Sequence, residues 1–395
     1  MDELQGMEEA QIEQEAIQAQ ETIQETVAVT ERPIEKPAEF IAPQPKIRPA
    51  SSDDDDIANF QVAQARIVVM GCGGGGCNTV NRLTEMGIVG ASTIAVNTDA
   101  RHLAMVKAHK KILIGKELTR GLGAGGYPDV GKKAAEESKQ DLKRAMKDCD
   151  LLFLTSGLGG GTGTGSAPVV AYLAKESGAI VIAAVTLPFK IEGARIVKAE
   201  EGLAKLREVC DTVIVIENQK LIDLAGNKPL KEAFGMADSL IATMIKGITE
   251  TISMPSLVNL DYADVRTIMK AGGVATIGVG ESDSQYRAKE AVQRALANPL
   301  LDVDYSGATG ALIQVIGGED MRLEEINLVG EMVSEHMDPE ALVMWGARIL
   351  PEFSGKMQVI AIVTGVKSPY ILGKTERVAK AIGTKFNELG IEVLI

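Results

Sequence analysis

The chain has 395 residues, a formal net charge of −13, 45% hydrophobic residues and 4% aromatic residues. This length is sufficient for two domains. The acidic balance, without a basic stripe that carries interleaved aromatic residues, argues against a nucleic-acid partner. The four cysteines and three histidines lack the spacing of zinc ligands. No secretory leader and no uninterrupted apolar span of membrane length occurs, so we expect a cytoplasmic protein without direct membrane insertion.

Most of the negative charge lies at the start of the chain. Residues 1–56 hold fifteen acidic side chains against four basic ones, and prolines occur at positions 33, 37, 43, 45 and 49. Such a composition cannot bury enough apolar surface to form a core. We therefore predict that residues 1–60 form an acidic, Pro-rich and largely disordered N-terminal extension.

The first strand pattern leads directly into a run of glycines. The β-branched residues 66–70 precede Gly71-Cys72-Gly73-Gly74-Gly75-Gly76, and a helical pattern begins at Asn78. A strand, a glycine loop and a helix form a phosphate site, because glycines let the backbone approach an anion and the first helical N–H groups lack internal partners. The run also matches the Gly-x-Gly-x-x-Gly motif of a dinucleotide-binding Rossmann unit. This loop alone does not separate the two interpretations.

Two more predicted strands are followed by a polar loop and by a glycine loop. The strand over 93–96 ends in Asn97-Thr98-Asp99-Ala100, and the strand over 111–114 is followed by a second glycine loop over 121–126. A dinucleotide fold would use Asp99 for a ribose hydroxyl.

The densest glycine loop spans residues 157–166, with six glycines in ten residues. It follows an apolar strand over 150–155 and precedes a helical pattern that has Pro168 near its first turn. No Gly-Lys-Ser/Thr closes the loop, so it is not a Walker A motif and must hold phosphate mainly through its backbone. Three glycine loops at successive strand ends exceed what a dinucleotide needs, and they favour a polyphosphate at one edge of a parallel sheet.

The remaining patterns complete two domains. Strands over 179–185 and 212–216 alternate with helices and predict a doubly wound α/β layer. Pro229 opens a helix whose apolar 3–4 spacing continues for over twenty residues, which corresponds to roughly 35 Å. Further strands with helices between them indicate a smaller mixed sheet, at 275–280, 310–316, 341–346 and 358–364.

As an ordered set, these motifs resemble those of FtsZ, the family of prokaryotic tubulin-like cell-division GTPases. The Gly-Thr-Gly-Thr-Gly stretch within 157–166 is similar to the tubulin signature, and residues 280–284 and 302–310 resemble the archaeal type. The resemblance covers roughly residues 62–366. It implies a Rossmann-like GTP-binding domain over 61–228, a central helix over 229–254, a second, GTPase-activating α+β domain with a mixed sheet over 255–366, and a C-terminal tail over 367–395.

The resemblance also implies which residues contact the nucleotide. Asp99 would lie beside the terminal phosphates and Mg²⁺, and Glu192 would bind the ribose. Arg195 would lie at the phosphates, although it follows Gly193 after a single residue. The implied nucleotide-binding residues are Gly73, Gly74, Gly75, Gly76, Cys77, Asn78, Asp99, Ala124, Gly125, Gly126, Gly160, Gly161, Thr162, Gly163, Thr164, Glu192, Arg195, Asn218, Phe234 and Asp238.

Two sets of residues have a structural and a functional interpretation. Phe234 and Asp238, four apart on one helix face, are either a core residue and a solvated one or, as the resemblance implies, the contacts of guanine. The Asp238 carboxylate would then accept from N1–H and the amino group of the base. Asp261 and Asp264 fit the cap and first turn of a helix. The resemblance assigns them to the attacking water and Asn259 to the phosphate end, and both interpretations can hold together.

The leading hypothesis is a GTPase that polymerises head to tail with itself and hydrolyses GTP to GDP, with Mg²⁺, between consecutive subunits of the cell-division ring. Division-ring adaptors or membrane anchors are the further partners that the resemblance implies, at the mid-cell division site. Two alternatives remain. One is an NAD(P)-dependent oxidoreductase that uses the loop at 71–76, and the other is a nucleotide-binding structural protein that assembles without turnover.

Overall fold

The computed structural model describes residues 65–225, 227–254, 256–258, 260–271, 274–297, 305–335 and 337–366. The described residues belong to one compact unit, Ala63–Ile395. The predicted extension over 1–60, the tail over 367–395 and the candidate residue Asn259 lie outside the described residues.

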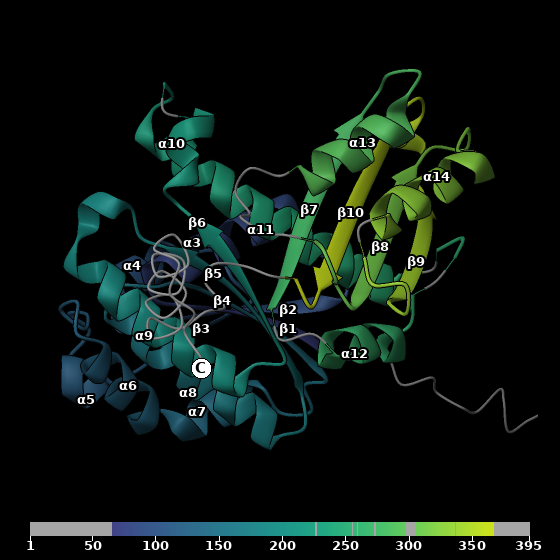
Figure 1. Ribbon diagram of the computed structural model, residues 1–395. Coiled ribbons are helices and arrows are strands. Elements are labelled where there is room, and N and C mark those ends of the chain that lie inside the picture. Colours follow the sequence, from purple (N-terminus) through teal and green to yellow (C-terminus); the bar gives the residue numbers. More distant parts are fainter. Residues whose placement is uncertain are drawn as a thin grey trace, which may run out of the picture. The chain divides into compact units, whose positions relative to one another are not determined.

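The strands that were predicted from apolar runs are all present. Their bounds are β1 Ile67–Cys72, β2 Ala91–Asn97, β3 Lys110–Leu113, β4 Leu151–Gly157, β5 Ile180–Leu187, β6 Thr212–Glu217, β7 Val274–Ser282, β8 Gly310–Gly317, β9 Leu342–Ile349 and β10 Met357–Thr364. Within the described ranges they form one ten-stranded sheet in the order β3-β2-β1-β4-β5-β6-β7-β10-β8-β9 (Figure 1). Strands β1 to β6 run parallel, so all their carboxyl ends meet at one edge.

The second half of the sheet is mixed, as the sequence predicted. β10 pairs antiparallel with β7 and with β8, and β8 pairs parallel with β9. The two halves join through β6 and β7, which pair at only two positions, Val213 with Val274 and Ile214 with Ala275. The sequence patterns did not indicate this short junction, because a parallel pairing of two residues leaves no signature in an apolar run.

The described helices are α3 Gly73–Met86, α4 Ala100–Met105, α5 Lys116–Thr119, α6 Pro128–Glu137, α7 Lys139–Ala145, α8 Thr162–Glu176, α9 Ala194–Val209, α10 Lys220–Ala225, α11 Leu230–Ser253, α12 Tyr262–Ala271, α13 Arg287–Leu296 and α14 Leu323–Ser334, with 3-10 turns η1 Lys190–Glu192 and η2 Pro351–Phe353. Helices α6 to α9 cover one face of β1 to β6, and α3 and α11 cover the other. Helices α13 and α14 cover one face of the mixed half. This arrangement is the predicted doubly wound α/β layer with a second α+β part.

Helix α11 packs against both halves of the sheet. Its 24 residues, about 36 Å of helix, contribute apolar side chains to a core shared with β1, β8 and β10. Lys246 donates to the carbonyl of Met86 at the end of α3 (3.1 Å), and Glu250 pairs with the largely buried Arg348 of β9 (2.8 Å). The predicted long central helix therefore links the two halves.

The structure differs from the prediction that each of these two glycine runs is a loop followed by a helix. Helix α3 begins at Gly73 and not at Asn78, and α8 begins at Thr162, which places Pro168 inside the helix rather than near its first turn. The reason is steric. A Cβ at Gly76 would lie 2.2 Å from the carbonyl oxygen of Thr155 in β4, so only glycine lets α3 pack this closely on the sheet.

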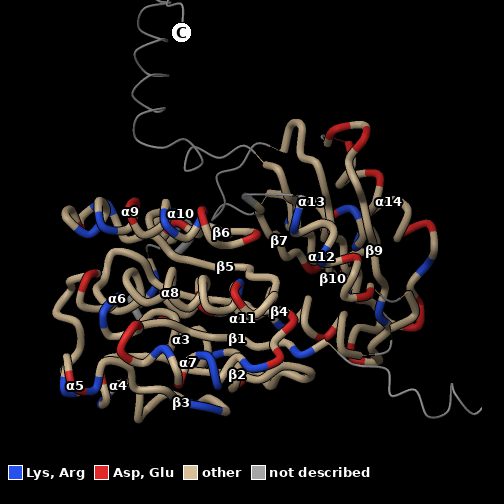
Figure 2. Tube along the Cα trace, turned by 90° about the horizontal axis from the view of Figure 1, so that it is seen from below, with Lys and Arg blue, Asp and Glu red and all other residues tan. Residues whose placement is uncertain are grey.

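In Figure 2, acidic and basic residues are intermixed along the helices, for example on α9. This agrees with the absence of a basic stripe in the sequence. None of the helices in the described ranges combines the length and the apolar character that are needed to cross a membrane.

The packing of α3 leads to a stability prediction. We expect Gly76→Ala to lower the free energy of unfolding by about 1–3 kcal/mol, since its methyl group would overlap the Thr155 carbonyl. Gly74→Ala is the matched control in the same helical turn, because a Cβ there meets nothing within 4 Å. The control should be neutral or stabilising, since alanine favours helix. Denaturant midpoints would measure both, and equal midpoints would contradict the steric argument.

Candidate functional site

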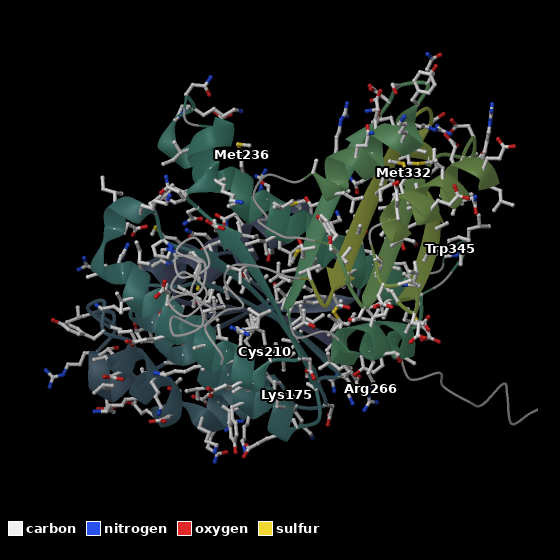
Figure 3. The ribbon with its side chains drawn as sticks, in the orientation of Figure 1. Lys175, Cys210, Met236, Arg266, Met332 and Trp345 are labelled. Atoms are coloured by element: carbon white, nitrogen blue, oxygen red, sulfur yellow. The ribbon has the colours of Figure 1, made fainter. Side chains whose placement is uncertain are left out.

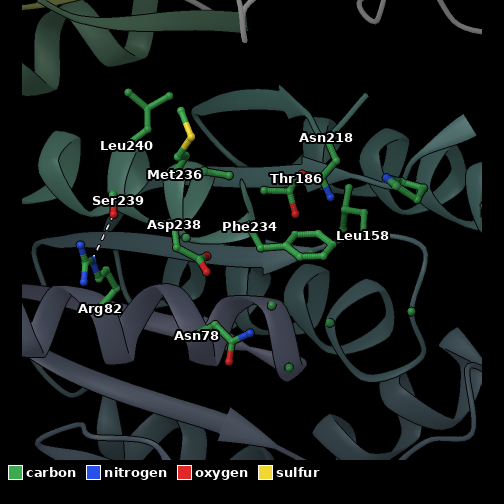
Figure 4. Close-up of a pocket in the computed structure, with 18 of the residues that line it drawn as sticks. Asn78, Arg82, Leu158, Thr186, Asn218, Phe234, Met236, Asp238, Ser239 and Leu240 are labelled. Carbon is green, nitrogen blue, oxygen red and sulfur yellow. Dashed lines mark hydrogen bonds between the residues drawn. The ribbon is translucent and has the colours of Figure 1, made fainter. Parts of the chain in front are cut away.

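A cavity of about 1500 Å³ opens at the carboxyl edge of the parallel strands, between α3, α8 and α11 (Figure 4). The ends of β4 and β5 reach it through Gly157 and Thr186, and η1 and the start of α11 form another side. The first turns of α3 and α8 therefore face the same space. Their N–H groups lack partners within the helix, and the helix dipoles favour an anion there.

Twelve of the residues that the sequence indicated line this cavity: Gly74, Gly75, Asn78, Gly160, Gly161, Thr162, Gly163, Glu192, Arg195, Asn218, Phe234 and Asp238. They come from five separate stretches of the chain. Eight indicated residues do not line it: Gly73, Gly76, Cys77, Asp99, Ala124, Gly125, Gly126 and Thr164. The structure shows contacts that several of these eight make.

Cys77 and Thr164 hold the loops together. The Cys77 thiol is buried, contacts the carbonyls of Gly71 and Val96, and has its pKa raised to about 12 by burial, so it faces the core. The Thr164 hydroxyl accepts a hydrogen bond from the N–H of Gly159 (2.9 Å) within its own loop. Their side chains therefore shape the cavity without facing it.

The loop over 121–126 supports the denser glycine loop from behind. A Cβ at Gly161 would lie 2.8 Å from the backbone nitrogen of Tyr127, so the two loops touch through their backbones. Lys198 of α9 donates to the carbonyl of Gly126 (2.8 Å), and its ammonium lies over the Tyr127 ring.

Asp99 caps α4 by accepting from the N–H of His102 (3.0 Å).

Phe234 and Asp238 lie on the face of α11 that borders the cavity (Figure 4). Phe234 is 40% exposed and packs edge-to-face on Phe189, with 5.6 Å between ring centroids, so it is not a core residue. Asp238 accepts a hydrogen bond from the Thr79 hydroxyl (2.8 Å), so it is not an isolated solvated carboxylate either. An aromatic face beside a carboxylate suits a flat base that carries donors.

Burial raises the pKa of the Asp238 carboxyl, while the hydrogen bond from Thr79 and the positive charge of Arg82 lower it. Arg82 is held in place by its own bond to the hydroxyl of Ser239 (3.0 Å, dashed in Figure 4). Thr79 and Arg82 thus favour the ionised form of Asp238.

Glu192 and Arg195 are paired with each other at the cavity wall. One oxygen of Glu192 accepts from the N–H of Phe189 (2.9 Å), and the other is bonded to the Arg195 guanidinium. The positive charge of Arg195 is therefore paired with the carboxylate of Glu192 in the preceding turn.

Sequence reasoning missed several lining residues, among them Asn81 and Arg82. Both share a helix face with Asn78, at spacings of three and four, which would have indicated them once α3 was placed. Thr79 was missed because its contact with Asp238 joins residues 159 positions apart.

Asp261 and Asp264 form the expected cap of α12. The Asp261 carboxylate accepts from the N–H of Asp264 (2.8 Å), and the Asp264 carboxylate accepts from the N–H of Asp261 (3.0 Å). This reciprocal pair fixes the exposed Asp261 carboxylate and the half-buried Asp264 carboxylate at the start of the helix.

The two carboxylates lie far from the cavity. The neighbouring Tyr262 donates from its hydroxyl to the carbonyl of Asp150 (2.9 Å), immediately before β4 begins. Gly157, at the other end of β4, lines the cavity, and seven strand residues span about 23 Å. Figure 3 agrees, since Arg266 of α12 lies low in the view, whereas Met236 beside the cavity lies high.

Among the described residues, no group of three or more His, Cys, Asp or Glu side chains could hold a metal ion.

Comparison with known families gives the class of protein. The family model "Tubulin/FtsZ family, GTPase domain" matches residues 66–226, and the model "FtsZ family, C-terminal domain" matches residues 273–367. The first range holds β1 to β6 with the glycine loops, and the second holds the mixed half of the sheet. Fold and site together define a GTPase of the tubulin-like class.

Individual relatives narrow this class. The chain is 58% identical to "Cell division protein FtsZ 2" of Methanocaldococcus jannaschii over 84% of this chain and 88% of the relative. It is 53% identical to "Cell division protein FtsZ 1" of Thermococcus kodakarensis over 85% and 91% of the two chains. A solved FtsZ dimer of M. jannaschii superposes with a TM-score of 0.74 and 52% identity over 80% of this chain and 93% of that one. The chain therefore belongs to the FtsZ family.

Membership in this family decides between guanine nucleotides and NAD(P), the two classes of nucleotide that the glycine run at 71–76 left open. The run lies inside the matched GTPase domain, so GTP and GDP are the substrate and product of this chain. The alternative of an NAD(P)-dependent oxidoreductase is not supported.

The first binding prediction concerns Asp238. Asp238→Asn replaces a charged acceptor by an amide, so we expect GTP affinity to fall by about 1.5–3 kcal/mol, roughly tenfold or more. Preference for GTP over inosine triphosphate, which lacks the 2-amino group, should shrink as well. Equilibrium titrations with both nucleotides measure this, and an unchanged preference would contradict the assignment of Asp238 to the base.

The second binding prediction concerns pH. GTP affinity should fall as pH drops through the raised pKa of Asp238, because only the ionised carboxylate accepts from two donors. Thr79→Val removes a hydrogen bond that lowers this pKa, so the loss of affinity should move to higher pH. Thr79→Ser keeps the hydroxyl and should retain the wild-type profile. Titrations that start at the ordinary pKa of an aspartate, about 4, and continue to neutral pH would test the pair, and identical profiles for both variants would exclude a role for Thr79.

Proposed function

We propose that this chain binds GTP in the cavity described above and assembles head to tail, so that Asp261 and Asp264 of one subunit complete the hydrolytic site of the next. The position of α12 carries the proposal. Its carboxylates lie at the amino edge of the parallel sheet, whereas the cavity lies at the carboxyl edge, about 23 Å of strand away. A subunit whose two edges face consecutive neighbours would bring them together.

Such a contact is heterologous, because different surfaces of the two copies meet. A heterologous contact that does not close into a ring continues as a filament. The solved M. jannaschii relative described as an FtsZ dimer supports self-association of this fold. Assembly would then activate hydrolysis, since the cavity and the carboxylates meet only in the polymer.

In this proposal the terminal phosphates lie against the first turns of α3 and α8, where the backbone N–H groups neutralise developing charge. Mg²⁺, held mainly by the phosphates and water, would add positive charge at the transferred group. Asp261 and Asp264 would orient the attacking water. The cap leaves this possible, because each carboxylate accepts at two oxygens and the cap uses one of them. Asn259 would act at the phosphate end.

Membership in a family of cell-division proteins supports the setting that we propose. We place the polymer in the division ring at mid-cell, on the cytoplasmic side, with adaptors or membrane anchors as further partners. The domain boundaries at 60, 228, 254 and 366 and the remaining nucleotide contacts, including Gly73, Asp99 and Ala124, belong to the same proposal.

A complementation assay tests the shared site. Asp264→Ala keeps the cavity but loses a carboxylate, whereas Asp238→Asn weakens the cavity and keeps both carboxylates. Each variant alone should release phosphate slowly at a GTP concentration that lies between the dissociation constant of the wild-type cavity and that of the Asp238→Asn cavity. A mixture of the two variants should release phosphate faster than the sum of the separate rates. Some subunit contacts then pair the wild-type cavity of an Asp264→Ala subunit with the wild-type carboxylates of an Asp238→Asn subunit.

Asp264→Asn serves as the control for the cap. Its amide oxygen can still accept from the N–H of Asp261, so α12 should keep its start while the charge is lost. This variant should also hydrolyse slowly and should also be rescued. Activity in the mixtures that equals the sum of the separate activities would show that each site is complete within one subunit. Filaments in electron micrographs without any phosphate release by the wild type would instead favour assembly without turnover.

A further inference from the structure

The ring of His102 bridges Asn78, which lines the cavity, and the buried Asn97, although neither the sequence motifs nor the site described above use this side chain. Its Nε2 lies 3.1 Å from the Oδ1 of Asn78, and its Nδ1 lies 3.2 Å from the Nδ2 of Asn97. Both distances are within hydrogen-bond range. The ring thus connects α3, which borders the cavity, to the end of β2.

The orientation of the Asn97 amide is fixed by its own backbone contacts. Its Oδ1 accepts from the N–H of Thr98 (2.9 Å) and more weakly from the N–H of Asp99 (3.4 Å). Asn97 is buried, so turning the amide over would replace these acceptor contacts by donor against donor. The Nδ2 group of Asn97 therefore faces His102 as a donor.

This orientation determines the tautomer of His102. Its Nδ1 must accept from Asn97, so the proton of the neutral ring lies on Nε2. Nε2 then donates to Asn78, and the group that receives it must be the amide oxygen. The Nδ2 group of Asn78, with its two donors, is left for the cavity that Asn78 lines.

We propose that His102 is a positioning residue that fixes the Asn78 amide so that its nitrogen donates to a bound guanine nucleotide. The inference rests on the proposed function, since it assumes that the nucleotide occupies this cavity. Asn78 lies one turn after Gly74 and on the side of the cavity that faces Phe234 and Asp238 (Figure 4). Its donors therefore meet the sugar and base part of the nucleotide, and the effect should be equal for GTP and GDP.

Two substitutions at His102 separate its two contacts. In His102→Gln, the terminal amide nitrogen can take the place of Nε2 and keep the bond to Asn78. In His102→Asn, the shorter side chain can reach Asn97 but not Asn78. We expect His102→Asn to bind GDP about three- to tenfold more weakly than wild type, the effect of one lost hydrogen bond, and His102→Gln to bind within about twofold of wild type.

The measurement is an equilibrium titration of the full chain with GDP, which is not hydrolysed. Unfolding midpoints of each variant check that the fold is intact. The reverse order, with His102→Gln weak and His102→Asn normal, would overturn the proposal, because His102 would then act through Asn97. Equal affinity of wild type and both variants would overturn it as well.

A double-mutant cycle shows whether His102 acts through Asn78. Asn78→Ala should weaken GDP binding, and adding His102→Asn to it should cause no further loss. Additive losses would contradict the proposal. Wild-type protein that does not bind GDP would refute the proposed function itself, which this set of variants distinguishes from a failure of the positioning role alone.

Discussion

The whole site depends on a close contact between two helix starts. The first turns of α3 and α8 meet backbone to backbone, and a Cβ at Gly73 would lie 2.6 Å from the nitrogen of Gly163. Beside them, a Cβ at Gly75 would lie 3.1 Å from the backbone of Gly157, at the end of β4. Only glycines permit this approach. It gathers two sets of unpaired helical N–H groups on one cavity, which would let these groups bind a polyphosphate as proposed, without a lysine in the loop.

The strands of the sheet could be predicted from the sequence for a physical reason. Parallel strands that are covered on both faces are continuous apolar runs, and such runs are bounded by glycine, asparagine and aspartate at their ends. The starts of α3 and α8 were not predicted correctly, because glycine has a low helix propensity. Tertiary packing overrides this propensity at both helix starts. Local patterns therefore located the elements but placed both helix starts too far along the chain.

The site was predicted in part. Residues in glycine-rich strand ends, such as Gly74 and Gly161, were found because the motif and the strand geometry coincide. Thr79 and His102 were missed, since their partners come from other elements and leave no local pattern. The loop over 121–126 carried a glycine signature but packs behind Gly161 rather than on the cavity. A glycine-rich sequence thus marks close backbone contact, and a ligand is only one cause of such contact.

The bond from Tyr262 to Asp150 has a consequence for any row of subunits joined edge to edge as proposed. It ties the capped carboxylates of α12 to the side of the sheet where β4 begins, and the cavity opens where β4 ends. The terminal subunit at one tip of the row would then present an open nucleotide site, and the terminal subunit at the other tip would present two fixed carboxylates. The row would have a direction, and its two tips would gain and lose subunits through different chemistry.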